Sequence, residues 1–316
     1  MQAYVMDQLV TRENFNEHQY LASNSDVLRA VQEGQFVSGR QHFELFGEKE
    51  SRTYRLSDKI TEAKKSKLER IKPLLCEDMP YTETDSYFDF LSEEFKKTYN
   101  IHDTDVFARG HGYDQNAMAL IEEFKSGMLL DYGAGKRPIY FRNVVNFEIA
   151  AYDTTDVLGV GEVLPFKDNT YDAVISIAVL EHVKDPFKCA NEIARVIKPG
   201  GKLYCAVPVL QPFHPHPNHY YNMSHQGLRN LFDNSLVIDK VEVIESLFPI
   251  WTLAWFLRSW VDGLKAPTQK KFLEMKVSDL IQDTSILLHE DFVTELSKEK
   301  NHELASGNVI FAHKAG

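Results

Sequence analysis

The stretch LLDYGAG, residues 129–135, places a carboxylate and two glycines directly after an apolar run. If that run is a buried strand, Asp131 stands at its carboxyl end, where open α/β sheets bind their ligands. Gly133 and Gly135 allow a sharp turn and a close approach of the backbone, and a following helix would offer N–H groups to an anion such as a carboxylate. The stretch therefore predicts a site for a small molecule.

A second acid, Asp153, ends the apolar segment FEIAAYD roughly 20 residues further on. An acid at the tip of a second strand can accept hydrogen bonds from both hydroxyls of a ribose. A dinucleotide-binding turn would require a third glycine where this chain has Pro138. The pattern favours a ribose-containing ligand and disfavours an NAD-dependent oxidoreductase.

Proton-transfer chemistry is available from histidines that follow the fifth predicted strand. The segment QPFHPHPNHYYNMSHQGL contains His214, His216, His219 and His225. Imidazole titrates near neutral pH and suits a general base that activates a hydroxyl. Packing and loop capping are the alternative roles for these rings.

The elements that must position these residues form an alternating pattern. From Gly127 onward, strand, turn and helix patterns follow one another, which predicts an α/β domain with a parallel sheet. Residues 171–177 are a predicted strand, and Asp185 and Pro186 are the predicted cap and first turn of a helix. Pro199-Gly200-Gly201 is expected to end that helix before the strand KLYCAVP.

The ordered segments LPF, YDAV, LEHV and KPGGKL, with the glycine turn and the ribose acid before them, resemble class I S-adenosylmethionine-dependent methyltransferases. The resemblance covers about residues 129–232. It implies a Rossmann-like, doubly wound, seven-stranded and mostly parallel sheet with S-adenosyl-L-methionine over its carboxyl edge. It assigns cofactor binding to Asp131, Gly133, Ala134, Gly135, Asp153, Gly161, Glu162 and Ile177. Lys136 and Arg137 are expected mainly as solvated surface cations, although they could reach the cofactor carboxylate.

Adenine recognition departs from the family pattern. Many relatives carry an acid where this chain has Val160 in GVGEVLPF. Backbone carbonyls or Glu162 are then expected to satisfy the adenine amino group. The departure keeps open a second function class, a catalytically degenerate methyltransferase fold that serves as a binding or scaffold protein.

The segment LEHV also resembles ubiquinone-pathway O-methyltransferases, which bind a divalent metal with a second Glu three residues before the Glu-His pair. Ala178 occupies that position here. Glu181, His182 and a loop histidine would make an incomplete site, so we expect no metal. Glu181 and His182 are instead expected to begin a helix and to line the acceptor pocket.

The histidine loop resembles the segment H-x-x-P-x-D-Y-Y-R-x-T-x-x-G-L of sugar- and polymer-associated methyltransferases, with His219 in the Asp place and Asn222 in the Arg place. The resemblance implies O-methylation of a sugar or glycan intermediate, with a changed acceptor. His214, His219, His182 and Glu181 are the candidate catalytic residues, and His214 is the first choice as base.

The chain divides into predicted modules by composition. Residues 1–57 form a small helical module, whose segment 15–52 resembles one in bacterial enzymes of glycan metabolism, and residues 58–125 form a helical connector that includes a solvated helix at 58–72. Residues 126–316 form the methyltransferase domain. Its last strands are expected at LVIDKVEVIES and GNVIFAHKA, with a helical insertion at 247–301 between them.

The insertion carries all three tryptophans, Trp251, Trp255 and Trp260. With Pro249 opening a helix, the first two lie on one face. Core packing is the default role of that face. A lid, a homodimer surface and peripheral membrane contact with a lipid-linked acceptor are the alternatives.

Composition excludes some partners. The net charge of -11 and the lack of a basic stripe argue against nucleic acid. Three cysteines without paired spacing fit free thiols, and no signal peptide or transmembrane run is recognised, so the expected location is cytoplasmic.

Overall fold

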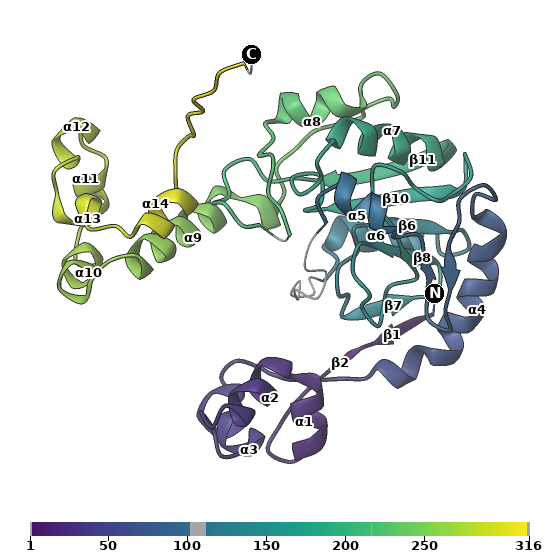
Figure 1. Ribbon diagram of the computed structural model, residues 1–316, viewed down its shortest axis with the longest axis horizontal. Helices are drawn as coiled ribbons and strands as arrows, with labels where there is room; N and C mark the ends of the chain where they lie inside the picture. The colour runs from purple at the N-terminus through teal and green to yellow at the C-terminus, as the bar shows by residue number, and fades with distance from the viewer. Residues whose placement is uncertain (1, 102–111, 216, 315–316) are drawn as a thin grey trace. The chain divides into compact units, whose positions relative to one another are not determined.

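The computed structural model describes residues 2–101, 112–215 and 217–314. The chain forms two compact units (Figure 1). Unit 1 comprises residues 1–179 and 184–206, and unit 2 comprises residues 180–183 and 207–316. The glycine turn belongs to unit 1, whereas Glu181, His182 and the histidine loop belong to unit 2.

A seven-stranded sheet forms the centre of unit 1 (Figure 1). Its strands are parallel to their neighbours except β4, which runs antiparallel to β5. In spatial order they are β11 (Ile197–Ala206), β10 (Tyr171–Ile177), β6 (Leu129–Tyr132), β8 (Val144–Glu148), β9 (Val157–Leu158), β5 (Phe88–Asp89) and β4 (Thr82–Glu83). The predicted doubly wound α/β class is confirmed.

Helices cover the two faces of this sheet because alternate strand residues point to opposite sides. Helix α6 (Gln115–Glu123) packs Leu120 and Ile121 against a cluster that includes Leu129 of β6. Helix α7 (Pro186–Val196) lies on the other face, where the Cys189 thiol contacts the hydroxyl of Tyr132. Each helix begins at a side-chain cap, as the sequence predicts for α7.

Two of the seven strands come from a part of the chain where none was expected. The segment 58–125 was predicted as a helical connector. It holds α4 (Thr61–Ile71), α5 (Glu93–Thr98) and α6, but also β4 and β5 of the sheet. The 58–72 helix is not fully solvated either, because α4 buries Lys64 and Lys67. The Lys67 ammonium lies 2.6 Å from Asp156 and over the Tyr140 ring.

The two strands expected near the carboxyl terminus are wrong. The described residues of 236–244 and 307–314 form no strand, and most of their apolar side chains are exposed, with Val237 at 93% and Phe311 at 92%. Alternating apolar residues form a strand only where another strand offers its edge for pairing. Pro199-Gly200-Gly201 also differs from expectation, since it lies inside β11 at a register shift against β10.

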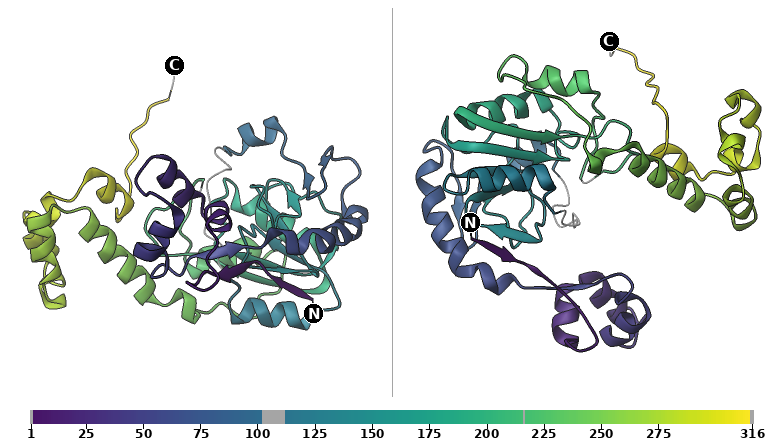
Figure 2. Two further views of the ribbon diagram at one scale, coloured as in Figure 1. Left: turned by 90° about the horizontal axis from the view of Figure 1, so that it is seen from below. Right: turned by 180° about the vertical axis from the view of Figure 1, so that it is seen from behind.

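The amino-terminal module contains the short helices that its pattern predicts: α1 (Glu17–Ser23), α2 (Ser25–Gln32), α3 (Gly39–His42) and the adjoining π-helical turn Phe43–Gly47. Tyr20, Val27 and Phe43 form its core. A ribbon of β2 (Asp7–Leu9) and β3 (Thr53–Arg55) leads into these helices (Figure 2), and β1 (Ala3–Val5) pairs with β7 (Ile139–Phe141).

The helices of unit 2 lie between residues 225 and 303. They are α8 (His225–Phe232), α9 (Pro249–Asp262), α10 (Ala266–Leu273), α11 (Val277–Leu280), α12 (Thr284–Leu287), α13 (Asp291–Thr294) and α14 (Lys298–Glu303). Pro249 begins α9 as predicted, and Trp251 and Trp255 lie four residues apart on this helix, but the three tryptophans have different surroundings. Trp260 stacks on Phe272 inside a helical core, Trp255 contacts the ring of His214, and Trp251 is 60% exposed. Within the described ranges, no helix combines the length and hydropathy needed to span a membrane.

Candidate functional site

The glycine turn after β6 has the backbone geometry that its sequence predicts. Gly133 and Gly135 have φ angles of 71° and 60°, a region that favours glycine. A Cβ atom on Gly133 would lie 2.5 Å from the Val179 side chain. The N–H groups of Gly133 and Ala134 both donate to the carbonyl of Phe147 on β8, at 3.0 Å. The turn is thereby tied to the neighbouring strand.

Asp131 is buried at the end of β6, but its carboxylate already has partners. The Arg137 guanidinium donates to both oxygens, at 2.7 and 2.9 Å, and the Tyr113 hydroxyl donates to one of them at 2.5 Å. Arg137 also lies over the Tyr113 ring. The expectation that Arg137 is a solvated surface cation is therefore wrong. A buried carboxylate at this position needs a buried cation, and Arg137 is 3% exposed.

Glu148 is the acid at the carboxyl end of β8, the strand beside β6. Its carboxylate accepts the N–H of Gly135 at 2.6 Å and that of Ile149 at 2.7 Å. Burial raises the pKa of Glu148 against the opposing effect of these hydrogen bonds. The sequence reasoning missed this residue, although it ends the apolar run VVNFE.

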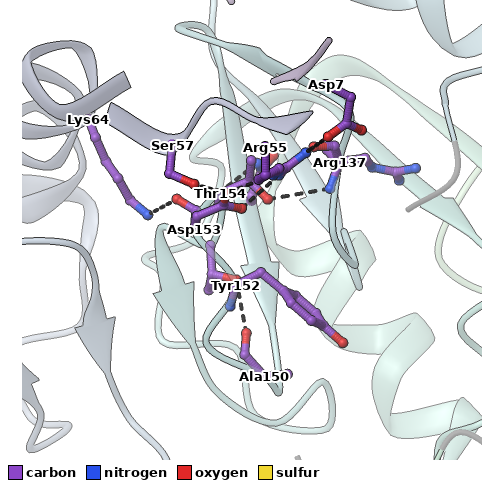
Figure 3. A network of polar contacts seen from close by, with 11 residues as sticks. Asp7, Arg55, Ser57, Lys64, Arg137, Ala150, Tyr152, Asp153 and Thr154 are labelled. Carbon is purple, nitrogen blue, oxygen red and sulfur yellow. Dashed lines mark hydrogen bonds and ion pairs between the residues drawn. The ribbon is translucent and has the colours of Figure 1, made fainter. Parts of the chain in front are cut away.

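Asp153 is not at a strand tip, contrary to expectation, because β8 ends at Glu148. Arg55 of the amino-terminal segment donates to both Asp153 oxygens, at 2.6 and 2.7 Å, and Ser57 donates at 2.5 Å (Figure 3). The Lys64 ammonium donates to its carbonyl at 2.6 Å, and Arg55 also donates to the carbonyl of Arg137. The Asp153 carboxylate thus joins the amino-terminal segment to the sheet.

The remaining predicted cofactor residues have mixed environments. A Cβ on Gly161 would overlap the Tyr132 hydroxyl, so the backbone is tightly packed there. Glu162 accepts the backbone N–H groups of Lys184 and Asp185, at 3.1 and 3.3 Å, in front of α7. Ile177 ends β10, and Val160 is buried. Ala178, after Ile177, has a φ of 55°, which is unusual for a residue with a side chain.

In unit 2, Glu181 and His182 lie in a turn and do not begin a helix, since α7 starts at Pro186. The Glu181 carbonyl accepts the N–H groups of Tyr220 and Tyr221, at 2.7 and 3.2 Å, which holds the turn against the histidine loop. The Glu181 side chain is fully buried, and burial raises its pKa to about 8.

Three of the predicted histidines gather beside this turn. The rings of His214 and His219 lie 4.1 Å apart, and those of His182 and His214 lie 5.2 Å apart. The His182 Nε2 lies 3.8 Å from Glu181 Oε1. His225 is exposed as the first residue of α8, and His216 lies outside the described residues. Unit 2 therefore brings together a carboxylate and several imidazoles that can accept a proton.

Part of this chain is similar to a known protein family. Residues 131–205 match the family model described as a methyltransferase domain. The demethylmenaquinone methyltransferase of Renibacterium salmoninarum is 37% identical over 87 residues, which cover 27% of this chain and 34% of the relative. The norajmaline N-methyltransferase of Rauvolfia serpentina is 30% identical over 149 residues, covering 46% and 44%. The chain spans less than half the length of these relatives.

The similarity to solved structures is low, both in TM-score and in sequence identity. A Haemonchus contortus "Phospholethanolamine N-methyltransferase 2" in complex with phosphomonomethylethanolamine and S-adenosylhomocysteine has a TM-score of 0.32 at 17% identity, covering 59% of this chain and 48% of that chain. The [4+2]-cyclase SpnF also has a TM-score of 0.32 at 17% identity, covering 66% and 83%. Residues 131–205, which contain the glycine turn, Glu148 and the strand that leads to Glu181, are thus the part of the chain that matches the methyltransferase domain family.

Proposed function

We propose that this protein is an S-adenosylmethionine-dependent methyltransferase that O-methylates a sugar or glycan intermediate. The observation that carries the proposal is the glycine turn between β6 and β7, which is held by Glu148 and lies inside the segment that matches a methyltransferase domain. The cofactor and the reaction class rest on this match together with the parallel sheet. The acceptor rests on the likeness of the histidine loop to sugar- and polymer-associated enzymes.

In the proposed cofactor site, the turn at Gly133, Ala134 and Gly135 receives the methionine end of S-adenosyl-L-methionine. Asp131 contributes to this site by holding Arg137 in place, because both oxygens of the carboxylate accept hydrogen bonds from that guanidinium. Glu148 takes the ribose role that the sequence suggested for Asp153. Its oxygens have lone pairs beyond those used by Gly135 and Ile149, and a strand tip beside the turn is where a ribose acid is needed.

In the proposed reaction, the acceptor oxygen forms a bond to the methyl carbon while the bond from that carbon to the sulfonium sulfur breaks. The sulfur keeps the electron pair, so S-adenosylhomocysteine leaves uncharged, and the hydroxyl proton passes to a base. Positioning contributes much of the rate, and a positioned base contributes roughly 10² to 10⁴-fold.

His214 is the base that we propose among the candidates His182, His214 and His219. The Nδ1 of His214 lies 2.6 Å from the Pro212 carbonyl, so this nitrogen carries the proton and Nε2 has the lone pair. Both ring nitrogens of His219 are used inside the loop, by the His214 N–H at 3.1 Å and by Asn222 Oδ1 at 3.1 Å. His219 is therefore better suited to orient His214.

The test begins with calorimetry of S-adenosylmethionine, S-adenosylhomocysteine and NAD, followed by a screen of nucleotide sugars and glycan fragments for release of S-adenosylhomocysteine. On an acceptor found in this way, His214→Ala should lower turnover by about 100-fold or more and leave cofactor affinity unchanged. His225→Ala, which alters an exposed histidine at the start of α8, is the matched control.

Full activity of His214→Ala would show that the base is elsewhere. A protein that binds neither S-adenosylmethionine nor S-adenosylhomocysteine would refute the methyltransferase assignment and favour the scaffold alternative.

A further inference from the structure

The strongest unassigned feature is a convergence of three electron-pair donors in unit 2. Glu181, His182 and His214 each place one side-chain donor atom within 4.8 Å of the donor atoms of the other two. They come from two chain segments, the turn after β10 and the histidine loop. The Glu181 carbonyl holds these segments together through the N–H groups of Tyr220 and Tyr221. The arrangement is therefore fixed by the backbone.

The hydrogen bonds of His182 and His214 indicate the same tautomer for both rings. The Nδ1 of His182 lies 2.5 Å from the Asn218 carbonyl, and the Nδ1 of His214 lies 2.6 Å from the Pro212 carbonyl. A carbonyl oxygen only accepts, so each Nδ1 carries a proton and each neutral ring has its lone pair on Nε2. A hydrogen bond from the second ring nitrogen to a carbonyl is the usual way in which a metal-binding histidine is oriented.

Glu181 supplies the oxygen donor of this group. Its side chain is fully buried, and within the described part of the chain neither oxygen has a hydrogen-bond partner. Among the described residues of unit 1, the fully buried carboxylates are neutralised by cations, Asp131 by Arg137 and Asp156 by Lys67. An isolated buried carboxylate is costly, and its cost is relieved by a proton or by a bound cation.

We propose that Glu181, His182 and His214 bind one divalent transition-metal ion, for which Zn²⁺ is the best chemical match. Two imidazole nitrogens and one carboxylate oxygen are the ligand set of open, catalytic-type zinc sites, whereas Mg²⁺ prefers oxygen ligands. Ligand atoms about 2.1 Å from a tetrahedral ion lie about 3.4 Å apart. The distance between His182 Nε2 and Glu181 Oε1 is 3.8 Å, and the other donor-atom pairs, which lie within 4.8 Å, would contract by at most about 1.4 Å on binding the ion.

The site uses the same lone pair of His214 that the proposed function uses. Without the ion, His214 accepts a proton. With the ion, His214 is a ligand, and the fourth position can take water or the acceptor oxygen and make it easier to deprotonate. The metal site does not depend on the identity of the acceptor, because its binding can be measured without any reaction.

The experiment titrates Zn²⁺ into the chelator-treated full chain by calorimetry, with Mg²⁺ as a parallel titrant. We expect one zinc ion per chain and much weaker binding of Mg²⁺. Glu181→Gln and His214→Ala should each weaken zinc binding by at least about tenfold, since loss of even an outer partner of a metal ligand costs 10–100-fold. The matched control is His225→Ala, which removes an exposed histidine at the start of α8 that is not in the ligand set.

Two further measurements keep the result interpretable. Cobalt(II) absorption distinguishes nitrogen and oxygen ligands from thiolates, so binding at Cys76, Cys189 or Cys205 would be recognised. Affinity for S-adenosylmethionine, which should be unchanged in every folded variant, separates failure of the metal site from failure of the proposed function. The proposal is overturned if the parent chain binds no stoichiometric zinc, if binding shows thiolate absorption, or if Glu181→Gln and His214→Ala bind zinc as tightly as the parent.

Discussion

Replacing Asp153 with Asn tests how the amino-terminal segment is attached to the sheet. The carboxylate accepts two hydrogen bonds from Arg55, at 2.6 and 2.7 Å, and one from Ser57 at 2.5 Å. The side chains of Arg55 and Asp153 are 9% and 21% exposed. Removing one partner of a fully buried ion pair costs about 3–5 kcal/mol.

Two features reduce that cost. Asp153 retains some contact with solvent, and Arg55 keeps a second ion pair with Asp7 at 3.0 Å. We therefore expect Asp153→Asn to lower the free energy of unfolding of unit 1 by about 2 kcal/mol, roughly a 30-fold change in the unfolding equilibrium. Asp168→Asn is the control, because Asp168 forms an ion pair with Arg195 while 69% exposed, and should cost under about 1 kcal/mol.

The effect should depend on pH. Burial alone would raise the pKa of Asp153, but the hydrogen bonds from Arg55 and Ser57 and the charge of Arg55 outweigh it and hold the pKa below its usual range. A carboxyl with a lowered folded-state pKa stabilises the fold above its unfolded pKa of about 4, and this stabilisation is lost as pH falls through the folded value. The difference between parent and Asp153→Asn should therefore be full at pH 7 and shrink below pH 4.

Urea denaturation followed by far-ultraviolet circular dichroism measures this difference. Tryptophan fluorescence does not report on the unfolding of unit 1, because all three tryptophans lie in unit 2. In the same variant, affinity for S-adenosylmethionine should stay within about threefold of the parent. Equal stability at pH 7 would refute the attachment role. A tenfold loss of cofactor affinity in a stable variant would indicate that Asp153, and not Glu148, binds the ribose.

Glu148→Gln should weaken S-adenosylmethionine binding by tenfold or more in calorimetry, because hydrogen bonds to a charged acceptor contribute about 1.5–3 kcal/mol each. The Gly135 N–H also depends on this carboxylate, so circular dichroism must first show a native fold; normal affinity in that folded variant would place the ribose elsewhere. Lys67→Met should destabilise the protein by about 3–5 kcal/mol in urea, since it leaves Asp156 buried without its cation. The exposed Lys65→Met on the same helix should change stability by under about 0.5 kcal/mol, and equal effects of the two substitutions would contradict the buried pair.

The sequence by itself determined the features that depend on neighbouring residues. The positive φ angles at Gly133 and Gly135 follow from a turn that only glycine adopts easily, and the start of α7 follows from the cap at Asp185 and the proline after it. The buried runs of β6 and β10 likewise predict a parallel sheet, because strands covered on both faces are apolar throughout. These local rules were enough to predict the α/β class and the turn.

Only the tertiary structure decided which acid lies at which edge. Glu148 and Asp153 both follow an apolar run, and the end of β8 depends on its pairing with β6. The environment of Asp153 depends on Arg55, which is distant in the chain, and local sequence carries no signal for such a partner. For the same reason the sequence suggested a surface cation at Arg137, whereas in the fold its guanidinium forms a buried ion pair with Asp131.

The expected carboxyl-terminal strands and the cluster of Glu181, His182 and His214 show the same difference between what local sequence predicts and what tertiary structure decides. Residues 236–244 alternate like a strand, but a strand needs an edge to pair with, and pairing is a property of the assembled sheet. The sequence marked Glu181, His182 and His214 as reactive types. The fold alone buried the carboxylate, set each Nδ1 against a carbonyl and brought the three side chains within 4.8 Å, because burial and hydrogen-bond direction arise from packing between distant segments.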